Sequence, residues 1–163
     1  MYYYGAEYQA GFDIKIGDVV INKFDYPDAK LLQDGETVPA TGVYFIADGA
    51  TVKKSGPVTD LVLIAERKDN KYSSKISTTG NISLGNLAEG IGFLCKGVSL
   101  SSEGTSSVYW FNLSGNIIER LYFDHCRIEF MVDKNFSNFN NAKSGIKNLL
   151  IESCHIVLDH ILK

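Results

Sequence analysis

The feature that most constrains this chain is a repeat near its C-terminal end. Residues 118–130 (IERLYFDHCRIEF) align without a gap with residues 146–158 (IKNLLIESCHIVL). The offset is 28 residues throughout (146 − 118 = 28), so apolar positions meet apolar positions and Cys126 meets Cys154. A fixed offset of this length is typical of architectures that stack equivalent segments on one another.

Both copies of the repeat have the alternation of β-strands. Residues 121–123 (LYF) and 128–130 (IEF) place apolar side chains at every second position, which puts them on one face of a strand. Two short strands separated by Asp124 and His125 predict one coil of a parallel β-helix, with successive coils about 4.8 Å apart. A pair of antiparallel hairpins in a sandwich would give the same alternation, but hairpins provide no reason for a constant offset.

A third coil is expected at residues 91–100. An offset of 30 residues (121 − 91 = 30) places Ile91 over Leu121 and Phe93 over Phe123. The charged segment 66–74 (ERKDNKYSS) and the polar segment 133–144 are predicted to be loops between coils, where solenoids tolerate changes in length.

The chain divides into two parts. Residues 1–37 are expected to form an N-terminal lead-in or cap, with strands followed by a short helix that begins near Pro27 and stops at Gly35. Residues 38–163 are expected to form the β-helix. The predicted fold class is therefore all-β, a single-stranded right-handed parallel β-helix of about five coils with an N-terminal strand and short-helix cap. No C-terminal cap is visible in the sequence, so we expect either that the chain is truncated there or that its last coil meets a partner.

Composition limits the function classes. The chain has 163 residues, a net charge of −3 and scattered Lys and Arg, which fit one domain and argue against the basic stripe of a nucleic-acid surface. Three cysteines exclude a complete disulfide framework. Cys126 and Cys154 either bridge on oxidation or act as small buried hydrophobes. No apolar run reaches the roughly 18 residues of a membrane-spanning helix, and residues 1–12 lack the regions of a signal peptide.

Four segments carry a family resemblance: TGVYFIADGATV, LVLIA, ISLGNLAEGIGFLCKGVSL and VYWFNLSGNIIERLYFDHCRIEF, in that order. Together they resemble the pectin-lyase-like right-handed β-helix domains of Bacteroides-type surface and secreted proteins, in particular uncharacterised domains of polysaccharide-utilisation systems. The resemblance covers about residues 38–163. It implies an exported, lipid-anchored parent protein at the outer-membrane surface or outside the cell, and a link to plant or host glycans.

One set of residues is a candidate for catalysis. A β-helix lyase needs carboxylates that hold calcium and an Arg or Lys base, and a glycosidase needs a pair of acids. Asp124 and Glu152 stack in register, and Arg127 lies three residues past Asp124. The favoured alternative is that the two acids are solvated groups beside a turn, and that His155, which stacks over Arg127, is a surface histidine. No zinc-site spacing, phosphate-binding loop or nucleophile elbow is present in the sequence.

Trp110 is the candidate for carbohydrate contact. In residues 108–113 (VYWFNL), Phe111 and Leu113 are expected to face inward, so Trp110 and Asn112 face outward and Tyr122 extends that face. Aromatic rings stack on sugars while neighbouring polar groups bind the hydroxyls. The alternative is that Trp110 packs under a loop or in an interface, as large aromatic residues are usually mostly buried.

The expected function is a non-catalytic carbohydrate-associated module of a surface or secreted bacterial protein. Its expected partner is a polysaccharide, with no nucleic acid and no cofactor other than an optional calcium ion. Two alternatives stay open: a polysaccharide lyase or glycoside hydrolase, and a structural or adhesive spacer. The uncapped last coil is also expected to offer a surface for self-association or for a neighbouring domain.

Overall fold

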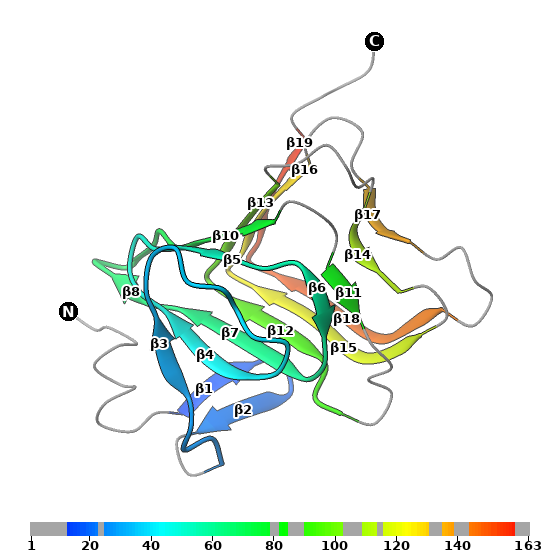
Figure 1. Ribbon diagram of the computed structural model, residues 1–163, viewed down its shortest axis with the longest axis horizontal. Coiled ribbons are helices and arrows are strands. Elements are labelled where there is room, and N and C mark those ends of the chain that lie inside the picture. Colours follow the sequence, from blue (N-terminus) through cyan, green and yellow to red (C-terminus); the bar gives the residue numbers. More distant parts are fainter. Residues whose placement is uncertain are drawn as a thin grey trace.

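The computed structural model describes residues 13–22, 25–78, 82–84, 90–102, 109–113, 116–130, 135–138 and 144–158. Within these residues the chain forms 19 strands and no helix, and the strands belong to five sheets (Figure 1). Three of the sheets are parallel and two are antiparallel hairpins. None of the described residues forms a helix that is long and apolar enough to cross a membrane.

The largest sheet has six strands, in the spatial order β18 (Gly145–Glu152), β15 (Ile117–Asp124), β12 (Phe93–Lys96), β7 (Leu61–Ala65), β4 (Gly42–Ile46) and β3 (Lys30–Leu32). The five-stranded sheet has the order β19 (His155–Leu158), β16 (Arg127–Phe130), β13 (Ser99–Ser102), β10 (Lys75–Thr78) and β5 (Thr51–Lys53). The four-stranded sheet has the order β17 (Asn135–Asn138), β14 (Tyr109–Asn112), β11 (Ile82–Leu84) and β6 (Gly56–Val58). The hairpins are β1 (Asp13–Ile16) with β2 (Val19–Asn22), and β8 (Arg67–Lys68) with β9 (Lys71–Tyr72).

The pairing of the repeat is confirmed at the level of single residues. β15 and β18 are parallel, with Leu121 opposite Leu149 and Asp124 opposite Glu152. β16 and β19 are also parallel, with Arg127 opposite His155. The alternative of antiparallel hairpins is therefore wrong for these segments.

The offset of 28 residues extends one layer further than the sequence analysis found. Phe93 lies opposite Leu121 (121 − 93 = 28), and Cys95 lies opposite Phe123. The predicted offset of 30, with Ile91 over Leu121, is wrong because strand β12 starts at Phe93 and not at Ile91. An offset of 30 would require two more loop residues between these layers, and the register of β12 with β15 shows no such difference.

The predicted fold class is wrong. The described strands form several parallel and antiparallel sheets, with six, five, four, two and two strands, and no single right-handed β-helix with a short-helix cap is indicated. Where the helix was expected, residues 30–32 form strand β3, which pairs in parallel with β4. The physical reason is that a sequence repeat fixes the pairing of neighbouring strands, whereas the assignment of all other strands to sheets depends on contacts that the repeat does not encode.

Two predicted loops contain strands. The charged segment 66–74 holds the β8–β9 hairpin, whose two connecting residues Asp69 and Asn70 have φ angles of 51° and 61°. Asp and Asn accept such left-handed backbone more readily than other side chains, and two successive positive φ angles define the type I′ hairpin turn. The polar segment 133–144 contains strand β17.

The six-stranded sheet is packed on both faces. Its inner face carries apolar side chains at alternate positions of β7, β12 and β15. These side chains form one core with residues of the other two parallel sheets. In this core the rings of Phe93, Phe111 and Phe123 contact one another at centroid distances of 5.6–6.3 Å. Its outer face is covered by the β1–β2 hairpin, which contributes Ile14, Ile16 and Ile21. The whole of β7 (LVLIA) is consequently buried, as continuous apolar strands of parallel sheets usually are.

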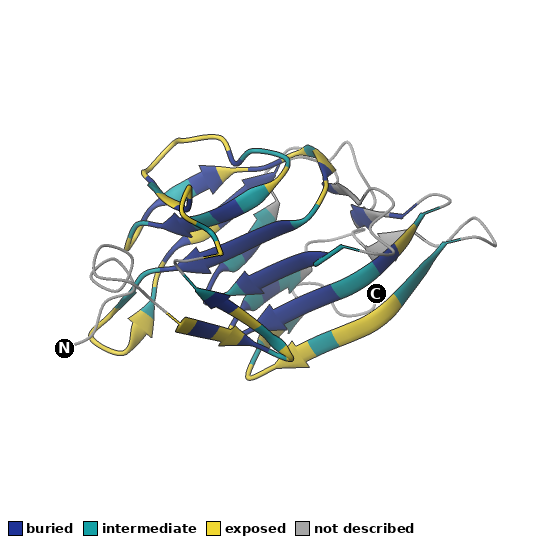
Figure 2. Ribbon diagram, turned by 90° about the horizontal axis from the view of Figure 1, so that it is seen from below, coloured by how far each residue is buried: buried dark blue, intermediate teal, exposed yellow. Residues whose placement is uncertain are grey.

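Burial ends abruptly at the last layer of the repeat. Leu149, Ile151 and Ile156 are 53%, 43% and 45% exposed, whereas their partners Leu121, Phe123 and Ile128 in the preceding layer are 0% exposed. Figure 2 shows this change from the buried inner strands to the exposed last strand of the sheet. We call the exposed edge formed by β18 and β19 the terminal edge.

Leu121→Ala and Leu149→Ala test this difference with the same substitution at paired positions. We expect Leu121→Ala to lower the free energy of unfolding by about 2–5 kcal/mol, since it leaves a cavity in the core. Leu149→Ala should change it by less than about 1 kcal/mol, because its side chain is half exposed. Urea unfolding followed by circular dichroism measures both values, and equal losses would contradict the described burial.

Candidate functional site

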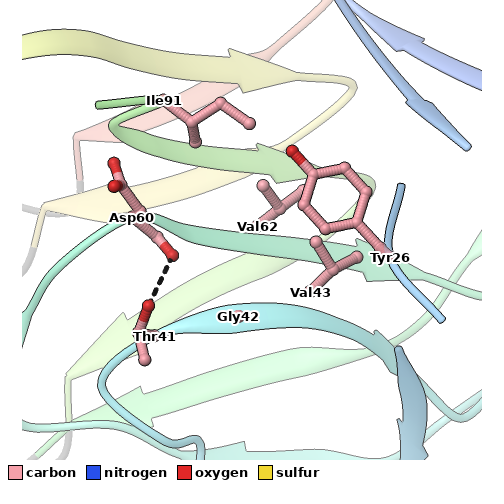
Figure 3. A pocket seen from close by; sticks show the side chains of 7 residues that line it. All are labelled: Tyr26, Thr41, Gly42, Val43, Asp60, Val62 and Ile91. Carbon is pink, nitrogen blue, oxygen red and sulfur yellow. Dashed lines mark hydrogen bonds between the residues drawn. The ribbon is translucent and has the colours of Figure 1, made fainter. Parts of the chain in front are cut away.

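A pocket lined by described residues lies on the outer face of the six-stranded sheet and offers a site for a small ligand, with a volume of about 360 Å³. Its floor is apolar and comes from Val43 on β4 and Val62 on β7, which are 5% and 1% exposed. Tyr26 and Asp60 lie on opposite sides of this floor, with Ile91 along a third side (Figure 3). We call this site the Tyr26–Asp60 pocket.

Asp60 is held firmly by its backbone. Its carbonyl oxygen accepts hydrogen bonds from the Gly42 amide at 3.0 Å and from the Thr41 hydroxyl at 3.1 Å. Its φ angle of 24° is unusual for a residue with a side chain, and a side chain at Gly90 would collide with the Asp60 carboxylate. The local fold therefore fixes where this carboxylate points.

The Asp60 carboxylate has one oxygen engaged and one available. Oδ1 accepts a hydrogen bond from the Gly92 amide at 2.9 Å. Among the described residues no group donates a hydrogen bond to Oδ2. A ligand hydroxyl in the pocket could therefore donate to Asp60.

Tyr26 provides the aromatic side of the pocket. Its backbone is held in a turn, in which its amide donates to the Asn22 carbonyl at 3.2 Å and its carbonyl accepts from the Ala29 amide at 3.1 Å. Burial raises the pKa of the Tyr26 hydroxyl, and the negative charges of Asp25 and Asp60 raise it further. The hydroxyl therefore stays protonated at neutral pH and remains able to donate a hydrogen bond.

A second hollow of about 210 Å³ adjoins the first and shares Tyr26, Gly42 and Val43 with it. Tyr44 and Asp25 are among its other lining residues. Because Tyr26 lines both hollows, an elongated ligand could contact its ring from two sides.

A groove of about 340 Å³ lies beyond the ends of β15 and β18, and neither Asp124 nor Glu152 is among its described lining residues. Arg127 lines this groove together with His125 and His155. Its Nε donates to the Glu129 carboxylate at 2.9 Å, and its Nη1 lies 3.2 Å from His155 Nδ1. The predicted stacking of His155 over Arg127 is thus confirmed.

Asp124 and Glu152 are neighbours in register but differ in environment. Glu152 is exposed, whereas Asp124 is 6% exposed. One Asp124 oxygen pairs with Lys96 Nζ at 2.9 Å and the other lies 2.5 Å from His125 Nδ1. Both oxygens of Asp124 are therefore engaged within the protein, which fits a structural ion pair that links β12 and β15.

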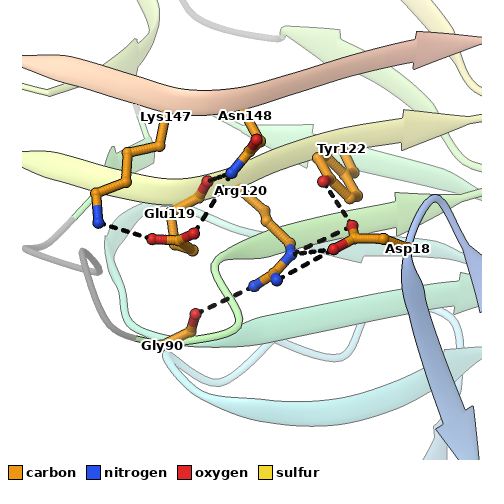
Figure 4. A network of polar contacts seen from close by, with 7 residues as sticks. All are labelled: Asp18, Gly90, Glu119, Arg120, Tyr122, Lys147 and Asn148. Carbon is orange, nitrogen blue, oxygen red and sulfur yellow. Dashed lines mark hydrogen bonds and ion pairs between the residues drawn. The ribbon is translucent and has the colours of Figure 1, made fainter.

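Tyr122 does not extend an exposed aromatic face. It is 7% exposed and packs under the β1–β2 hairpin, and its hydroxyl donates to Asp18 at 2.6 Å. Arg120 also pairs with Asp18, at 3.2 Å, and reaches the Gly90 carbonyl (Figure 4). These contacts attach the turn of the hairpin to β15.

Trp110 and Asn112 lie in strand β14, and their side chains lie outside the part of the chain that the structure describes. The prediction that Phe111 and Leu113 face inward is confirmed, since both are 0% exposed in the core. The assignment of Trp110 and Asn112 to carbohydrate binding stays a prediction.

Within the described ranges, no group of three or more His, Cys, Asp or Glu side chains has the arrangement of a metal site. The calcium ion considered from the sequence therefore has no assigned ligands.

Comparison with known proteins gives no match: no protein-family model, no curated protein and no solved structure is significantly similar to the chain. The site must therefore be interpreted from its own chemistry.

Sequence reasoning missed Tyr26 and Asp60. The only signal for Asp60 is its place directly before the buried strand LVLIA, at one end of a parallel strand. The sequence predicts a short helix that begins near Pro27, and this prediction gives Tyr26 no place in a pocket. Nothing in the sequence indicates that these residues, 34 positions apart (60 − 26 = 34), lie around one pocket.

The Asp18 contacts predict a dependence of stability on pH. The hydrogen bond from Tyr122, and then that from Arg120, lower the pKa of Asp18. A carboxylate whose pKa is lower in the folded state stabilises the fold above its unfolded pKa of about 3.9, and this contribution is lost as the pH falls further. We expect the melting temperature of the wild type to fall more steeply below about pH 4 than that of Asp18→Asn.

Tyr122→Phe serves as the partner variant, because it removes the hydroxyl that contributes most to the lowered pKa while it keeps the ring in place. Its acid-dependent loss of stability should lie between those of the wild type and Asp18→Asn. If the melting temperatures of the wild type and the two variants change in parallel between pH 2 and pH 6, the described contacts of Asp18 are contradicted.

Proposed function

We propose that this chain is a non-catalytic module that binds a neutral saccharide in the Tyr26–Asp60 pocket. The observation that carries the proposal is the combination of one aromatic ring, an apolar floor and one fixed carboxylate around a volume of about 360 Å³. Ligand sites are usually mostly apolar, with a few polar groups that fix orientation. A pyranose ring presents such a mixture, because it has apolar C–H faces and hydroxyl groups at its rim.

The roles of the residues follow from their chemistry. The Tyr26 ring would lie against a C–H face of the sugar, and its hydroxyl would bond a ring substituent. Asp60 Oδ2 would accept a hydrogen bond from a sugar hydroxyl, and hydrogen bonds to charged groups are the stronger ones. The adjoining hollow beside Tyr44 would hold a second sugar unit of an oligosaccharide.

The charge of the site favours a neutral ligand over an acidic one. Asp60 lines the pocket and Asp25 lines the adjoining hollow, so a uronate or sulfate group would face like charge.

The seven described residues that line the pocket include one carboxylate, that of Asp60, and the carboxylates of Asp25 and Asp28 line the adjoining hollow. Most glycosidases act with two acids on opposite sides of one bond, so the single carboxylate of the pocket itself supports binding as its role. The lyase or hydrolase alternative with Asp124, Glu152 and Arg127 receives less support, since both oxygens of Asp124 are engaged by Lys96 and His125. Placement of the module on a surface or secreted protein is supported by the sequence resemblance alone.

Tyr26→Ala and Trp110→Ala distinguish the pocket from the site proposed on the sequence. We expect a neutral oligosaccharide found by glycan-array screening, with and without calcium, to lose about tenfold or more in affinity for Tyr26→Ala, which equals about 1.4 kcal/mol. Trp110→Ala, on a different sheet, should retain the wild-type affinity. Isothermal titration calorimetry measures both.

If Trp110→Ala loses affinity and Tyr26→Ala does not, the saccharide binds at Trp110 and not in the Tyr26–Asp60 pocket. Tyr26→Phe and Asp60→Asn refine the test, because each keeps the shape of the pocket and changes one polar group. If the wild type binds none of the neutral glycans, the proposal of carbohydrate binding is wrong.

A second candidate function, the structural or adhesive one, is favoured by the terminal edge. We propose that this edge pairs with a second copy of the chain. Leu149, Ile151 and Ile156 present apolar surface there, and β18 is a terminal strand of its sheet with backbone groups that can pair with another strand. Lys147 of β18 already pairs with the Glu119 carboxylate at 2.9 Å, so the exposed apolar side chains and the backbone groups of β18 carry the pairing.

Leu149→Lys tests self-association, with Val20→Lys as a matched control, because Val20 is 51% exposed on β2 and Leu149 is 53% exposed on β18. We expect light scattering after size-exclusion chromatography to give a dimer for the wild type and Val20→Lys and a monomer for Leu149→Lys. A wild type that stays monomeric at high concentration would exclude the second copy as the occupant.

A further inference from the structure

Cys126 and Cys154 occupy equivalent positions in neighbouring layers. The strands before them pair in register through Asp124 and Glu152, and the strands after them pair through Arg127 and His155. The His155 amide donates to the Cys126 carbonyl at 2.8 Å. Because parallel strands lie about 4.8 Å apart, the two Cα atoms fall within the range of about 4.4–6.8 Å that disulfides span.

The turns that hold the two cysteines have the same backbone conformation. Each cysteine follows a residue with a left-handed backbone, His125 with a φ of 51° and Ser153 with a φ of 52°. Left-handed backbone is uncommon for residues with side chains, so its occurrence in both turns shows that the layers are alike in detail. The two Cα–Cβ bonds consequently point in similar directions.

The two thiols also make equivalent contacts. Cys126 Sγ donates to the Cys95 carbonyl at 3.5 Å, and Cys154 Sγ donates to the Phe123 carbonyl at 3.3 Å. Cys95 and Phe123 are themselves paired residues of β12 and β15. Both thiols therefore lie on the inner side of their turns, one layer apart.

The environments of the two thiols differ in access. Cys126 is 2% exposed, whereas Cys154 is half-buried at the terminal edge. The hydrogen bond from the Cys126 thiol, aided by backbone hydrogen bonds, lowers the pKa of Cys154 to about 7, while burial raises the pKa of Cys126. Access and ionisation thus favour the same residue, Cys154, as the one that reacts first.

We propose that Cys154 and Cys126 form a peroxide-reactive pair, in which Cys154 is oxidised first and Cys126 then closes a disulfide. The Cys154 thiolate attacks one oxygen of a hydroperoxide such as hydrogen peroxide. The O–O bond breaks, hydroxide leaves and takes up a proton to give water, and Cys154 becomes a sulfenic acid. The Cys126 sulfur then attacks the Cys154 sulfur, the S–S bond forms, and the sulfenic oxygen leaves as water with the proton of Cys126.

Cys95 provides an internal control. It is 0% exposed in the core, and burial raises its pKa well above the ordinary value. In the folded protein it should take no part in the reaction.

The experiment treats the folded full-length chain with one equivalent of hydrogen peroxide at pH 6 and follows the reaction by peptide mass spectrometry. We expect a Cys126–Cys154 disulfide in the wild type and in Cys95→Ala. In Cys126→Ser the reaction should stop at a sulfenic acid on Cys154, which dimedone traps. In Cys154→Ser, Cys126 should stay reduced, and circular dichroism confirms that each variant is folded.

The rate provides the second criterion. Oxidation of the folded chain at pH 6 should be about tenfold or more faster than that of the chain in urea, because a thiol of ordinary pKa is much less ionised there. The proposal is overturned if the folded wild type oxidises no faster than the unfolded chain, or if Cys154 proceeds to a sulfinic acid with Cys126 still reduced. None of these outcomes depends on saccharide binding, so this proposal and the proposed function fail separately.

Discussion

The in-register stacking of inner side chains on the six-stranded sheet is the interaction on which the rest of the structure depends. In β7, β12 and β15, apolar residues at alternate positions face one core and are 0% exposed. Each of these strands has a neighbouring strand on both sides within its sheet, so its inner side chains lose nearly all their contact with water. Because successive side chains of a strand point to opposite faces, the register also decides which side chains lie on the outer face. A shift by one residue would exchange the two faces along every strand.

The outer face is where functional chemistry becomes possible, since it is covered only in part. The β1–β2 hairpin covers Leu94 and Tyr122 and is attached through the contacts of Asp18 with Arg120 and Tyr122. Lys96 adds a further link, because its ammonium group pairs with Asp124 and donates to the Lys15 carbonyl at 3.0 Å. Beside the hairpin, the floor formed by Val43 and Val62 stays accessible from the Tyr26–Asp60 pocket. Of the predicted catalytic residues, Asp124 thus helps to fix the covering hairpin through Lys96.

The sequence predicts the strands and the register of the repeat, which depend on local and periodic patterns. It does not predict contacts between segments that are far apart in the chain. The constant offset of the repeat is sufficient to pair Leu121 with Leu149 and Cys126 with Cys154, because the alternation of side chains leaves one register that buries both apolar faces. The fold class failed because the repeat covers few of the strands. Tyr122 was placed on an exposed face because its polar neighbours set the alternation, whereas a hairpin about 100 residues earlier in the chain covers it. The pocket was missed for the same reason, since it depends on how the turn around Tyr26 packs on β4 and β7.

The terminal edge connects two properties that would otherwise seem unrelated. Leu149 and Ile151 are exposed because no described strand lies beyond β18, and Cys154 is half-buried for the same reason, while its equivalent Cys126 is enclosed by a further layer. Whatever covers the terminal edge must therefore also shield Cys154 from solutes. If oxidation at Cys154 and coverage of the edge exclude each other, linkage requires the coupling to be reciprocal: a partner on the edge slows oxidation, and an oxidised pair weakens the partner by the same free energy. The exposure of β18 and β19 among the described strands would then make association sensitive to peroxide without any movement of the core.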